Sequence, residues 1–153
     1  MSIVVLKFGG TSLKNKKTRT AAVDRIDETI QKGKKPVVIV SAIGREGSAY
    51  ATDTLIKLAE DTFPELAKRE KDLIMSCGEI ISSVIMVQNL KKNEMDAKAL
   101  TGAQAGILTD ENFCNSDVLN INPENILKLI NQDIILISFR FHDHYPGVFF
   151  SSV

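Results

Sequence analysis

The sequence lacks the features that mark metal-binding and nucleic-acid-binding proteins. Its only two cysteines, Cys77 and Cys114, have 36 residues between them, which is not a metal-ligand spacing. Its 19 basic residues balance its 19 acidic residues, so the chain as a whole does not attract nucleic acid or anionic lipid. Any anion that it binds must therefore be held locally.

Long apolar runs are absent as well. The apolar run at residues 3–6 is too short for a signal-peptide core or a membrane span, and no cleavage site follows it. We therefore expect a cytoplasmic protein with reduced thiols and no membrane partner. With 153 residues and 44% hydrophobic content, the chain has the size of one domain or of part of a larger one.

What the sequence does contain begins with a strand, a helix and a second strand. Residues 3–8 and 36–40 are short apolar runs of the kind that form buried strands. Between them, apolar residues recur at helical spacing from Ala22 to Ile30, and Gly33 is a typical helix stop. This order predicts a parallel βαβ unit of an α/β fold, with both strand ends on one rim of the sheet.

The longest predicted helix covers residues 70–92, where apolar residues recur three and four positions apart. These residues are Leu73, Cys77, Ile80, Ile81, Val84 and Ile85. Further helices are predicted at residues 53–60 and 123–131, further strands at 95–100 and 134–137, and a mobile flap at 45–50.

A glycine pair, Gly9 and Gly10, directly follows the first strand. Glycines let a ligand approach the backbone closely, so that N–H groups can donate to phosphate oxygens, and Lys7 adds a positive charge nearby. The alternative interpretation is a plain tight turn with a surface lysine. The segment is neither the nucleotide-binding loop Gly-x4-Gly-Lys-Ser/Thr nor the dinucleotide fingerprint Gly-x-Gly-x-x-Gly.

The sequence Lys-Phe-Gly-Gly-Thr-Ser at residues 7–12 resembles the N-terminal signature of aspartate kinases, which belong to the amino acid kinase superfamily. Residues 40–44, 50–55, 76–83 and 100–106 resemble the family's successive blocks, in its order and at its spacing. The resemblance extends over residues 2–137. The block at 50–55 is most similar to the enzymes of the diaminopimelate and lysine pathway.

The resemblance implies a three-layer α/β/α sheet and transfer of the ATP γ-phosphate, with Mg²⁺, to the side-chain carboxylate of L-aspartate. Such transfer depends on positioning and charge neutralisation. Lys7 would be catalytic, and Lys7, Gly9, Gly10, Thr11 and Ser41 would hold the nucleotide. For Ser41, a turn-forming hydroxyl is an equally good interpretation.

Two further residues are predicted to bind the aspartate substrate. Glu79 matches a family glutamate, and its partner would be the substrate ammonium or Lys7; the alternative is a glutamate on the polar, solvent-facing side of its helix. Thr52 matches a substrate-contacting position, and it is also a candidate N-cap of the helix at 53–60. His142 and His144 have no third ligand near them in sequence, so no metal site is predicted.

The resemblance stops at Ile137. The family continues with a Val-Ala-Gly-Phe-Gln-Gly-like turn and a Gly-Arg-Gly-Gly-Ser-Asp-like loop, and neither is present. We therefore divide the chain into the N-terminal half of a kinase domain, residues 1–137, and a divergent tail, residues 138–153. An incomplete sheet leaves an edge strand and apolar faces uncovered, so we expect a homo-oligomer or an aggregation-prone fragment.

Three functions remain open at this point. The first is an aspartate kinase, weak or inactive alone; the second is a non-catalytic module that binds phosphate or nucleotide; the third is a remnant without function. A glutamate or acetylglutamate kinase is the nearest alternative enzyme, but Thr11, Ser12 and the Gly78-Glu79 pair argue against it.

Overall fold

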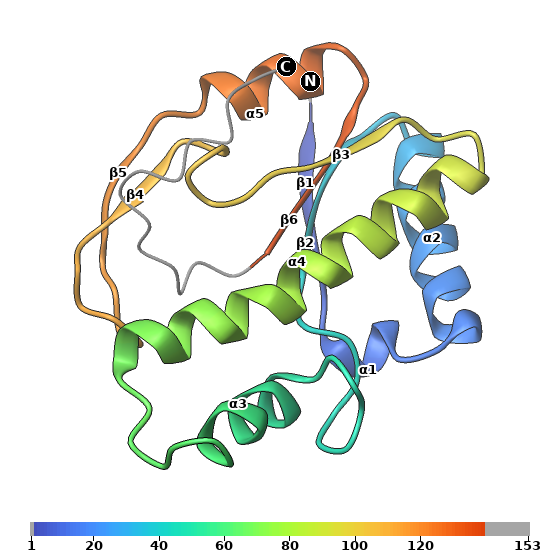
Figure 1. Ribbon diagram of the computed structural model, residues 1–153. Helices are drawn as coiled ribbons and strands as arrows, with labels where there is room; N and C mark the ends of the chain where they lie inside the picture. Colours follow the sequence, from blue (N-terminus) through green and yellow to red (C-terminus); the bar gives the residue numbers. More distant parts are fainter. Residues whose placement is uncertain (1, 140–153) are drawn as a thin grey trace.

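The computed structural model describes residues 2–139, which form an α/β fold around a parallel sheet (Figure 1). The sheet has four strands in the order β1-β2-β6-β3, and β4 and β5 form a separate antiparallel pair. The strands are β1 Ile3–Phe8, β2 Lys35–Val40, β3 Ala97–Ala99, β4 Ile107–Thr109, β5 Val118–Ile121 and β6 Ile135–Phe139. The helices are α1 Gly10–Leu13, α2 Lys16–Gln31, α3 Thr52–Glu60, α4 Lys68–Lys92 and α5 Glu124–Asn131. The predicted parallel α/β sheet is confirmed.

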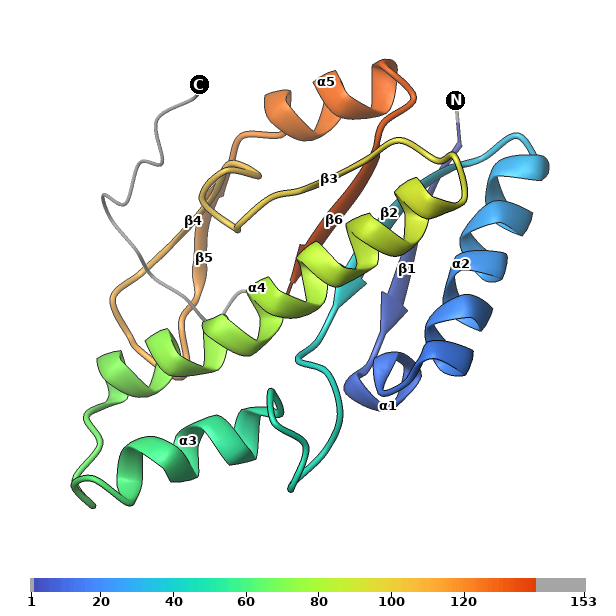
Figure 2. The same cartoon turned by 45° about the vertical axis from the view of Figure 1, so that its right-hand side comes forward.

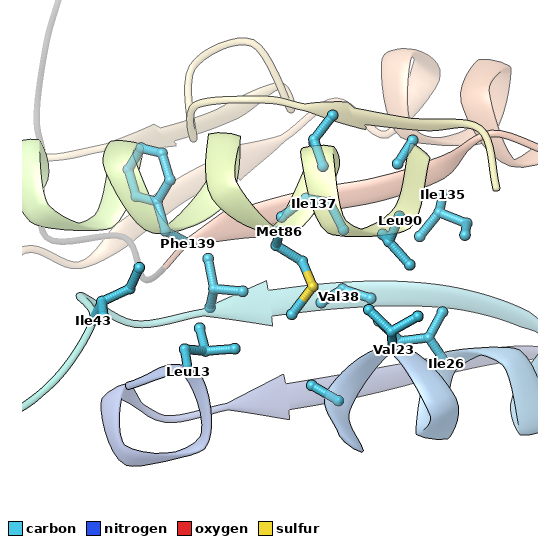
Figure 3. Close-up of a cluster of buried hydrophobic side chains, with 14 residues drawn as sticks. Leu13, Val23, Ile26, Val38, Ile43, Met86, Leu90, Ile135, Ile137 and Phe139 are labelled. Atoms are coloured by element: carbon cyan, nitrogen blue, oxygen red, sulfur yellow. The ribbon is translucent and has the colours of Figure 1, made fainter. Parts of the chain in front are cut away.

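Helices α2 and α4 cover one face of the sheet. Ile26 of α2 and Leu90 of α4 are fully buried, and they belong to one apolar cluster with Val38 of β2 and Ile137 of β6 (Figure 3). Alternate residues of a strand point to opposite faces, so this cluster takes every second residue of β2 and β6. Burial of this cluster is the main force that holds the two helices to the sheet.

Helix α5 covers the opposite face (Figure 2). Its Leu129 and Ile130 pack in a second cluster with Val37 of β2 and Leu136 of β6. The sheet is thus enclosed between helices over β2 and β6, as a three-layer fold requires.

Helix α2 is closed at both ends by local hydrogen bonds. At its start, the Asn15 side chain accepts from the Thr18 N–H, and the Thr18 hydroxyl oxygen accepts from the Asn15 N–H. These two reciprocal bonds form a capping box. At its end, Gly33 adopts φ +69° and its N–H donates to Ile30, while the Lys34 N–H donates to Thr29. These two bonds form a Schellman motif, and the predicted stop at Gly33 is confirmed.

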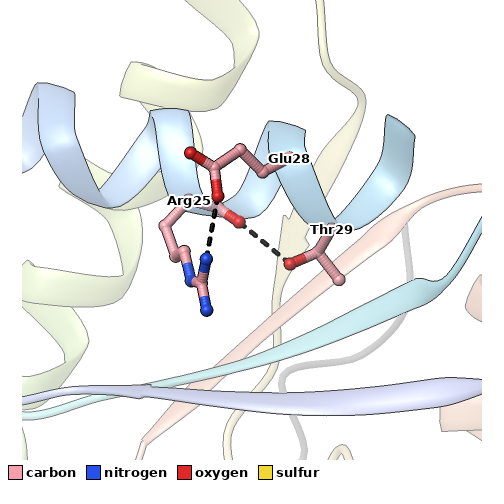
Figure 4. A network of polar contacts seen from close by, with 3 residues as sticks. All are labelled: Arg25, Glu28 and Thr29. Carbon is pink, nitrogen blue, oxygen red and sulfur yellow. Dashed lines mark hydrogen bonds and ion pairs between the residues drawn. The ribbon is translucent and has the colours of Figure 1, made fainter. Parts of the chain in front are cut away.

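Near its C-terminal end, α2 carries a small polar network of two exposed charged side chains and the buried Thr29 (Figure 4). Arg25 donates to the Glu28 carboxylate at 2.8 Å, and the Thr29 hydroxyl donates to the Arg25 carbonyl at 2.9 Å. Because both charged side chains are more than half exposed, the pair adds less than about 1 kcal/mol. The buried side of α2 therefore fixes its position.

Helix α4 exists as predicted, but its buried face differs from the prediction. Leu73, Cys77, Ile80 and Val84 are exposed, whereas Asp72, Ser76, Glu79, Ser82 and Ser83 are buried. By length and composition α4 could cross a membrane, yet a core helix passes the same test, and its Met86 and Leu90 are buried here. The N-terminal half of α4 thus turns a polar stripe inward.

Some elements were not predicted at all. Helix α1 and the β4–β5 pair have no counterpart in the sequence-based assignment, and β3 is shorter than the predicted strand at 95–100. Strand β6 continues through Ser138 and Phe139, which pair with Ile39 and Val40 of β2. The remainder of the predicted tail, with both histidines, lies outside the described residues.

Candidate functional site

The ends of β1 and β2 meet at one rim of the sheet, as predicted (Figure 1). The Ser41 N–H donates to the Phe8 carbonyl at 3.1 Å, and the Gly44 N–H donates to the Gly10 carbonyl at 3.0 Å. These two bonds hold the turn after β1 against the turn after β2. Gly9, Gly10 and Ser41 are therefore neighbours in space.

Gly9 and Gly10 occupy different environments. A Cβ at Gly10 would lie 2.4 Å from the Ala42 carbonyl oxygen and 2.6 Å from that of Gly44, both of them backbone atoms. A Cβ at Gly9 would meet no atom within 4 Å, and the φ of Gly9 is an ordinary −74°. Packing explains Gly10, whereas Gly9 borders open space where a ligand can approach the backbone.

Groups that favour an anion border this opening. Among residues 2–139, the N–H groups of Gly10 and Thr11 donate no hydrogen bond, as is usual in the first turn of a helix. Lys7 is exposed, and in the same part of the chain no carboxylate forms an ion pair with it. Free N–H groups and an unpaired lysine within five residues of the chain suit the terminal phosphates of a nucleotide.

Helix α4 comes close to the same region at Gly78, the residue before Glu79. The preceding residue, Gly78, lies so close to the loop after β2 that a Cβ there would be 2.8 Å from the Tyr50 carbonyl and 3.0 Å from the Ala42 Cβ. The Glu79 side chain is only 8% exposed. The solvent-facing alternative for Glu79 is therefore wrong.

The predicted N-cap at Thr52 is wrong. Ala51 is the N-cap residue of α3, Thr52 is the first residue inside the helix, and no side chain caps this end. Thr52 is half-buried, so its hydroxyl is not committed to the helix terminus. Ser41 is also half-buried, and only its backbone contribution to the turn is defined.

Sequence reasoning missed Asp72, which is 2% exposed on the inward stripe of α4. Its Oδ2 accepts the N–H of Cys114 at 2.6 Å, which fastens the loop between β4 and β5 to α4. The helical spacing of Asp72, Ser76 and Glu79 was visible in the sequence. The buried face was nevertheless assigned to the neighbouring apolar residues, because apolar side chains are usually the buried ones.

The contact also affects the Cys114 thiol. Burial raises its pKa, and the hydrogen bond and negative charge of Asp72 raise it further, because all of these disfavour the thiolate. Cys114 is therefore a poor nucleophile at neutral pH.

A separate hollow of about 170 Å³ lies at the opposite end of the strands. Pro36, Ile130 and Ile135 line it, and Lys35 pairs with Asp133 at its margin. The hollow lies at the N-terminal ends of β2 and β6, whereas the rim at Gly9 lies at the C-terminal ends of the strands. It is therefore not part of the candidate site. Within residues 2–139, no group of three or more His, Cys, Asp or Glu side chains gathers to hold a metal ion.

Comparison with known proteins identifies the family of this chain. The sequence pattern of the amino acid kinase family matches residues 2–148, and the chain belongs to this family. Within it, the chain matches the N-terminal third of aspartokinases. Aspartokinase 1 of Bacillus subtilis (strain 168) is 45% identical over 139 residues, which are 90% of this chain and 34% of the relative. The aspartokinase of Geobacillus stearothermophilus is 36% identical over 137 residues, 90% of this chain and 32% of the relative.

Solved structures agree with the fold. Aspartate kinase from Synechocystis superposes with a TM-score of 0.75 at 30% identity, covering 90% of this chain and 22% of that chain. Escherichia coli aspartokinase III, solved in complex with aspartate and ADP, gives a TM-score of 0.70 at 16% identity over 92% of this chain and 41% of that chain. The chain thus spans about a third of the length of the curated relatives it matches.

Proposed function

We propose that this chain is the N-terminal part of an aspartate kinase of the diaminopimelate and lysine pathway, acting in the cytoplasm. The reaction is transfer of the γ-phosphate of ATP to the side-chain carboxylate of L-aspartate, with Mg²⁺ as the nucleotide's counter-ion. The observation that carries the proposal is the rim itself, where open space at Gly9 adjoins Lys7 and free N–H groups. The aspartate and ADP bound by the Escherichia coli relative support it.

In this proposal each residue has a physical task. The N–H groups of Gly10 and Thr11 bind phosphate oxygens, and Lys7 neutralises the charge that develops on the transferred phosphoryl group. Buried Glu79 offers its carboxylate to the ammonium of aspartate, as a charge-assisted contact. Thr52 supplies a hydroxyl donor to the aspartate substrate, and Ser41 supplies one to the nucleotide. No magnesium ligand is assigned to the described residues.

We expect the chain alone to turn over slowly or not at all. The Gly-Arg-Gly-Gly-Ser-Asp-like loop of the family is absent from the sequence, and with it the arginine that binds the substrate carboxylate. The second candidate function is therefore a phosphate- or nucleotide-binding fragment. It is favoured by the Gly9 opening, whose donors, Lys7 and the N–H groups of Gly10 and Thr11, need no later segment.

A hydroxamate assay with L-aspartate and Mg-ATP, run beside calorimetric titration with ADP, separates these functions. Lys7→Ala removes the proposed phosphate charge, and Lys14→Ala is the matched control, since Lys14 is also exposed. Loss of one charged donor should lower turnover by about 10²-fold to 10³-fold. Turnover sensitive to Lys7 alone supports the kinase, and ADP binding without turnover supports the fragment. If neither hydroxamate formation nor ADP binding is changed by Lys7→Ala, both functions are rejected for this site.

A further inference from the structure

The tip of the β4–β5 hairpin is attached to α4 at Cys114. The Cys114 N–H donates to Asp72 Oδ2 at 2.6 Å, and the Cys114 thiol donates to the Lys68 carbonyl at 3.6 Å. Cys114 has φ +66°, a left-handed conformation that is unfavourable for a residue with a Cβ. Strained backbone of this kind persists where the surrounding contacts impose it. The contacts with α4 therefore hold the tip in this conformation.

The hairpin stands apart from the main sheet. Among residues 2–139, β4 and β5 pair only with each other, and all four residues of β5 are exposed. A two-stranded hairpin is only marginally stable by itself in water. At its base, the Asn122 N–H donates to the Gly106 carbonyl at 2.7 Å. The hairpin is thus positioned from its base and from its tip, where Asp72 binds it.

Asp72 lies on the same side of α4 as Glu79. The two residues are about two helical turns apart, or about 10 Å along the axis, and their exposed fractions are 2% and 8%. On the same side, the hydroxyls of Ser76 and Ser83 donate to carbonyls of α4 itself. Asp72, by contrast, reaches the hairpin. Its contact with Cys114 places the hairpin tip beside the side of α4 that carries Glu79 (Figure 2).

The Asp72 carboxylate is kept at a cost to folding. Its Oδ1 has no hydrogen-bond partner among residues 2–139, and a buried carboxylate with an unpaired oxygen is destabilising. An ionised acceptor, however, holds an N–H group more strongly than a neutral amide does. A group that strengthens one contact while it weakens the fold is typical of a functional site.

We propose that Asp72 is a positioning residue for the aspartate substrate. It holds the β4–β5 hairpin beside α4, so that the hairpin forms one wall of the space in which Glu79 meets the substrate ammonium. Asp72 acts through the hairpin and does not touch the substrate. The inference rests on the proposed function, because that function assigns the substrate to Glu79. The nucleotide is assigned to the rim at Gly9, so Asp72 should affect L-aspartate and leave ADP unaffected.

Calorimetric titration of the full chain with L-aspartate, and separately with ADP, tests this selectivity. Asp72→Ala removes the acceptor and should weaken L-aspartate binding by about tenfold to a hundredfold, because the wall of the site is displaced. Binding of ADP should stay within about twofold, as expected for a distant site. Asp72→Asn keeps a neutral acceptor, so its loss of L-aspartate affinity should be smaller, about threefold. Ser76→Ala is the matched control, since Ser76 is buried on the same side of α4 but bonds to its own helix.

Amide hydrogen exchange shows whether the hairpin is the cause. Exchange at Cys114 and along β4 and β5 should be faster in Asp72→Ala and unchanged in Ser76→Ala. Urea unfolding of each variant defines conditions in which all of them are folded, so that lost stability is not mistaken for lost binding. If Asp72→Ala does not fold, Asp72→Asn carries the test with the same pattern, faster exchange in the hairpin and weaker binding of L-aspartate alone.

Several outcomes overturn the inference. Equal losses of L-aspartate and ADP affinity would mean general damage to the fold, and an unchanged L-aspartate affinity or unchanged hairpin exchange would mean that Asp72 positions nothing. Binding of ADP without any binding of L-aspartate to the unmutated chain rejects the inference and leaves the nucleotide-binding function standing. L-aspartate binding that depends on Glu79 but not on Asp72 rejects the inference and leaves the kinase standing. A selective effect of Asp72 together with no effect of Lys7→Ala supports the inference and rejects the proposed phosphate site.

Discussion

Gly9 and Gly10 stand side by side but lack side chains for different reasons. Gly10 is enclosed by backbone carbonyls of Ala42 and Gly44, which cannot rotate away from an added methyl group. Gly9 faces open space and has a φ that alanine also adopts. A mutation at each position should therefore separate stability from ligand binding.

We expect Gly10→Ala to lower the free energy of unfolding by about 1–3 kcal/mol, as overpacked sites do. Gly9→Ala should change it by less than about 0.5 kcal/mol, as substitutions in open space do, while weakening ADP binding. Urea unfolding and calorimetry measure the two quantities. Equal loss of stability in both variants would show that Gly9 is a packing residue, and unchanged ADP binding by Gly9→Ala would show that Gly9 has no ligand role.

Asp72 provides a second test at the scale of single residues. Replacing it by asparagine keeps an acceptor for the Cys114 N–H and removes the negative charge beside the thiol. The charge of Asp72 helps to raise the pKa of Cys114, so Asp72→Asn should lower that pKa. The thiolate then forms at lower pH, and alkylation of Cys114 should accelerate at a fixed pH below its pKa.

The rate of iodoacetamide modification of Cys114, followed by mass spectrometry across pH, measures this shift. Cys77 on the same helix as Asp72 serves as the internal reference within each sample. A profile for Cys114 that stays in place would mean that burial alone sets its pKa.

At the scale of elements, the end of α2 makes a quantitative prediction. Gly33 has φ +69°, and a Cβ there would meet no atom within 4 Å, so only backbone strain opposes a side chain. Gly33→Ala should cost about 1–2 kcal/mol of folding stability, the penalty of a left-handed L-residue. Gly33→Asn should cost less, because asparagine tolerates this conformation. Denaturant midpoints rank the three proteins, and an equal loss for both variants would contradict the account.

The contrast between α2 and α4 shows what sequence can predict here. Gly33 specifies the end of α2, and the Val- and Ile-rich sequences of β1 and β2 specify strands. The βαβ unit was therefore predicted correctly. In α4 the apolar residues Leu73 and Ile80 follow a helical period but face outward, because the inward side of the first half carries the buried polar groups Asp72 and Glu79. Periodicity identifies a helix, but it cannot tell a polar interior from solvent.

The candidate site was predicted in the same uneven way. Gly9 and Ser41 were expected on one rim because parallel strands end together, and the structure confirms it. Gly78 lets α4 pack closely against the Tyr50 carbonyl, and this contact joins segments that are distant in the sequence. No local signal in the sequence reports such a contact, and the β4–β5 loop that reaches Asp72 was missed for the same reason.

At the scale of the whole molecule, the last described strand is part of the core. Phe139 is 4% exposed and packs in the cluster under α2 and α4, and Ser138 donates from its hydroxyl to the Leu100 carbonyl at 3.1 Å. We expect Phe139→Ala to lower the free energy of unfolding by about 3–5 kcal/mol, as large-to-small core substitutions do. Phe63→Ala, at a site that is 62% exposed, is the matched control. Thermal unfolding of both variants measures the difference, and similar midpoints would place Phe139 outside the core.

The position of β6 also determines the order in which the chain folds. Strand β6 lies between β2 and β3, and within residues 2–139 β3 has no other partner in the sheet. On a ribosome, β1, α2 and β2 emerge first and can pair at once, because their contacts are local. The centre of the sheet must wait for about a hundred further residues, from Val40 to Phe139, before β2 finds its second neighbour. Until then β2 has one open side during synthesis, and we expect closure of that long loop to be the slow step of folding.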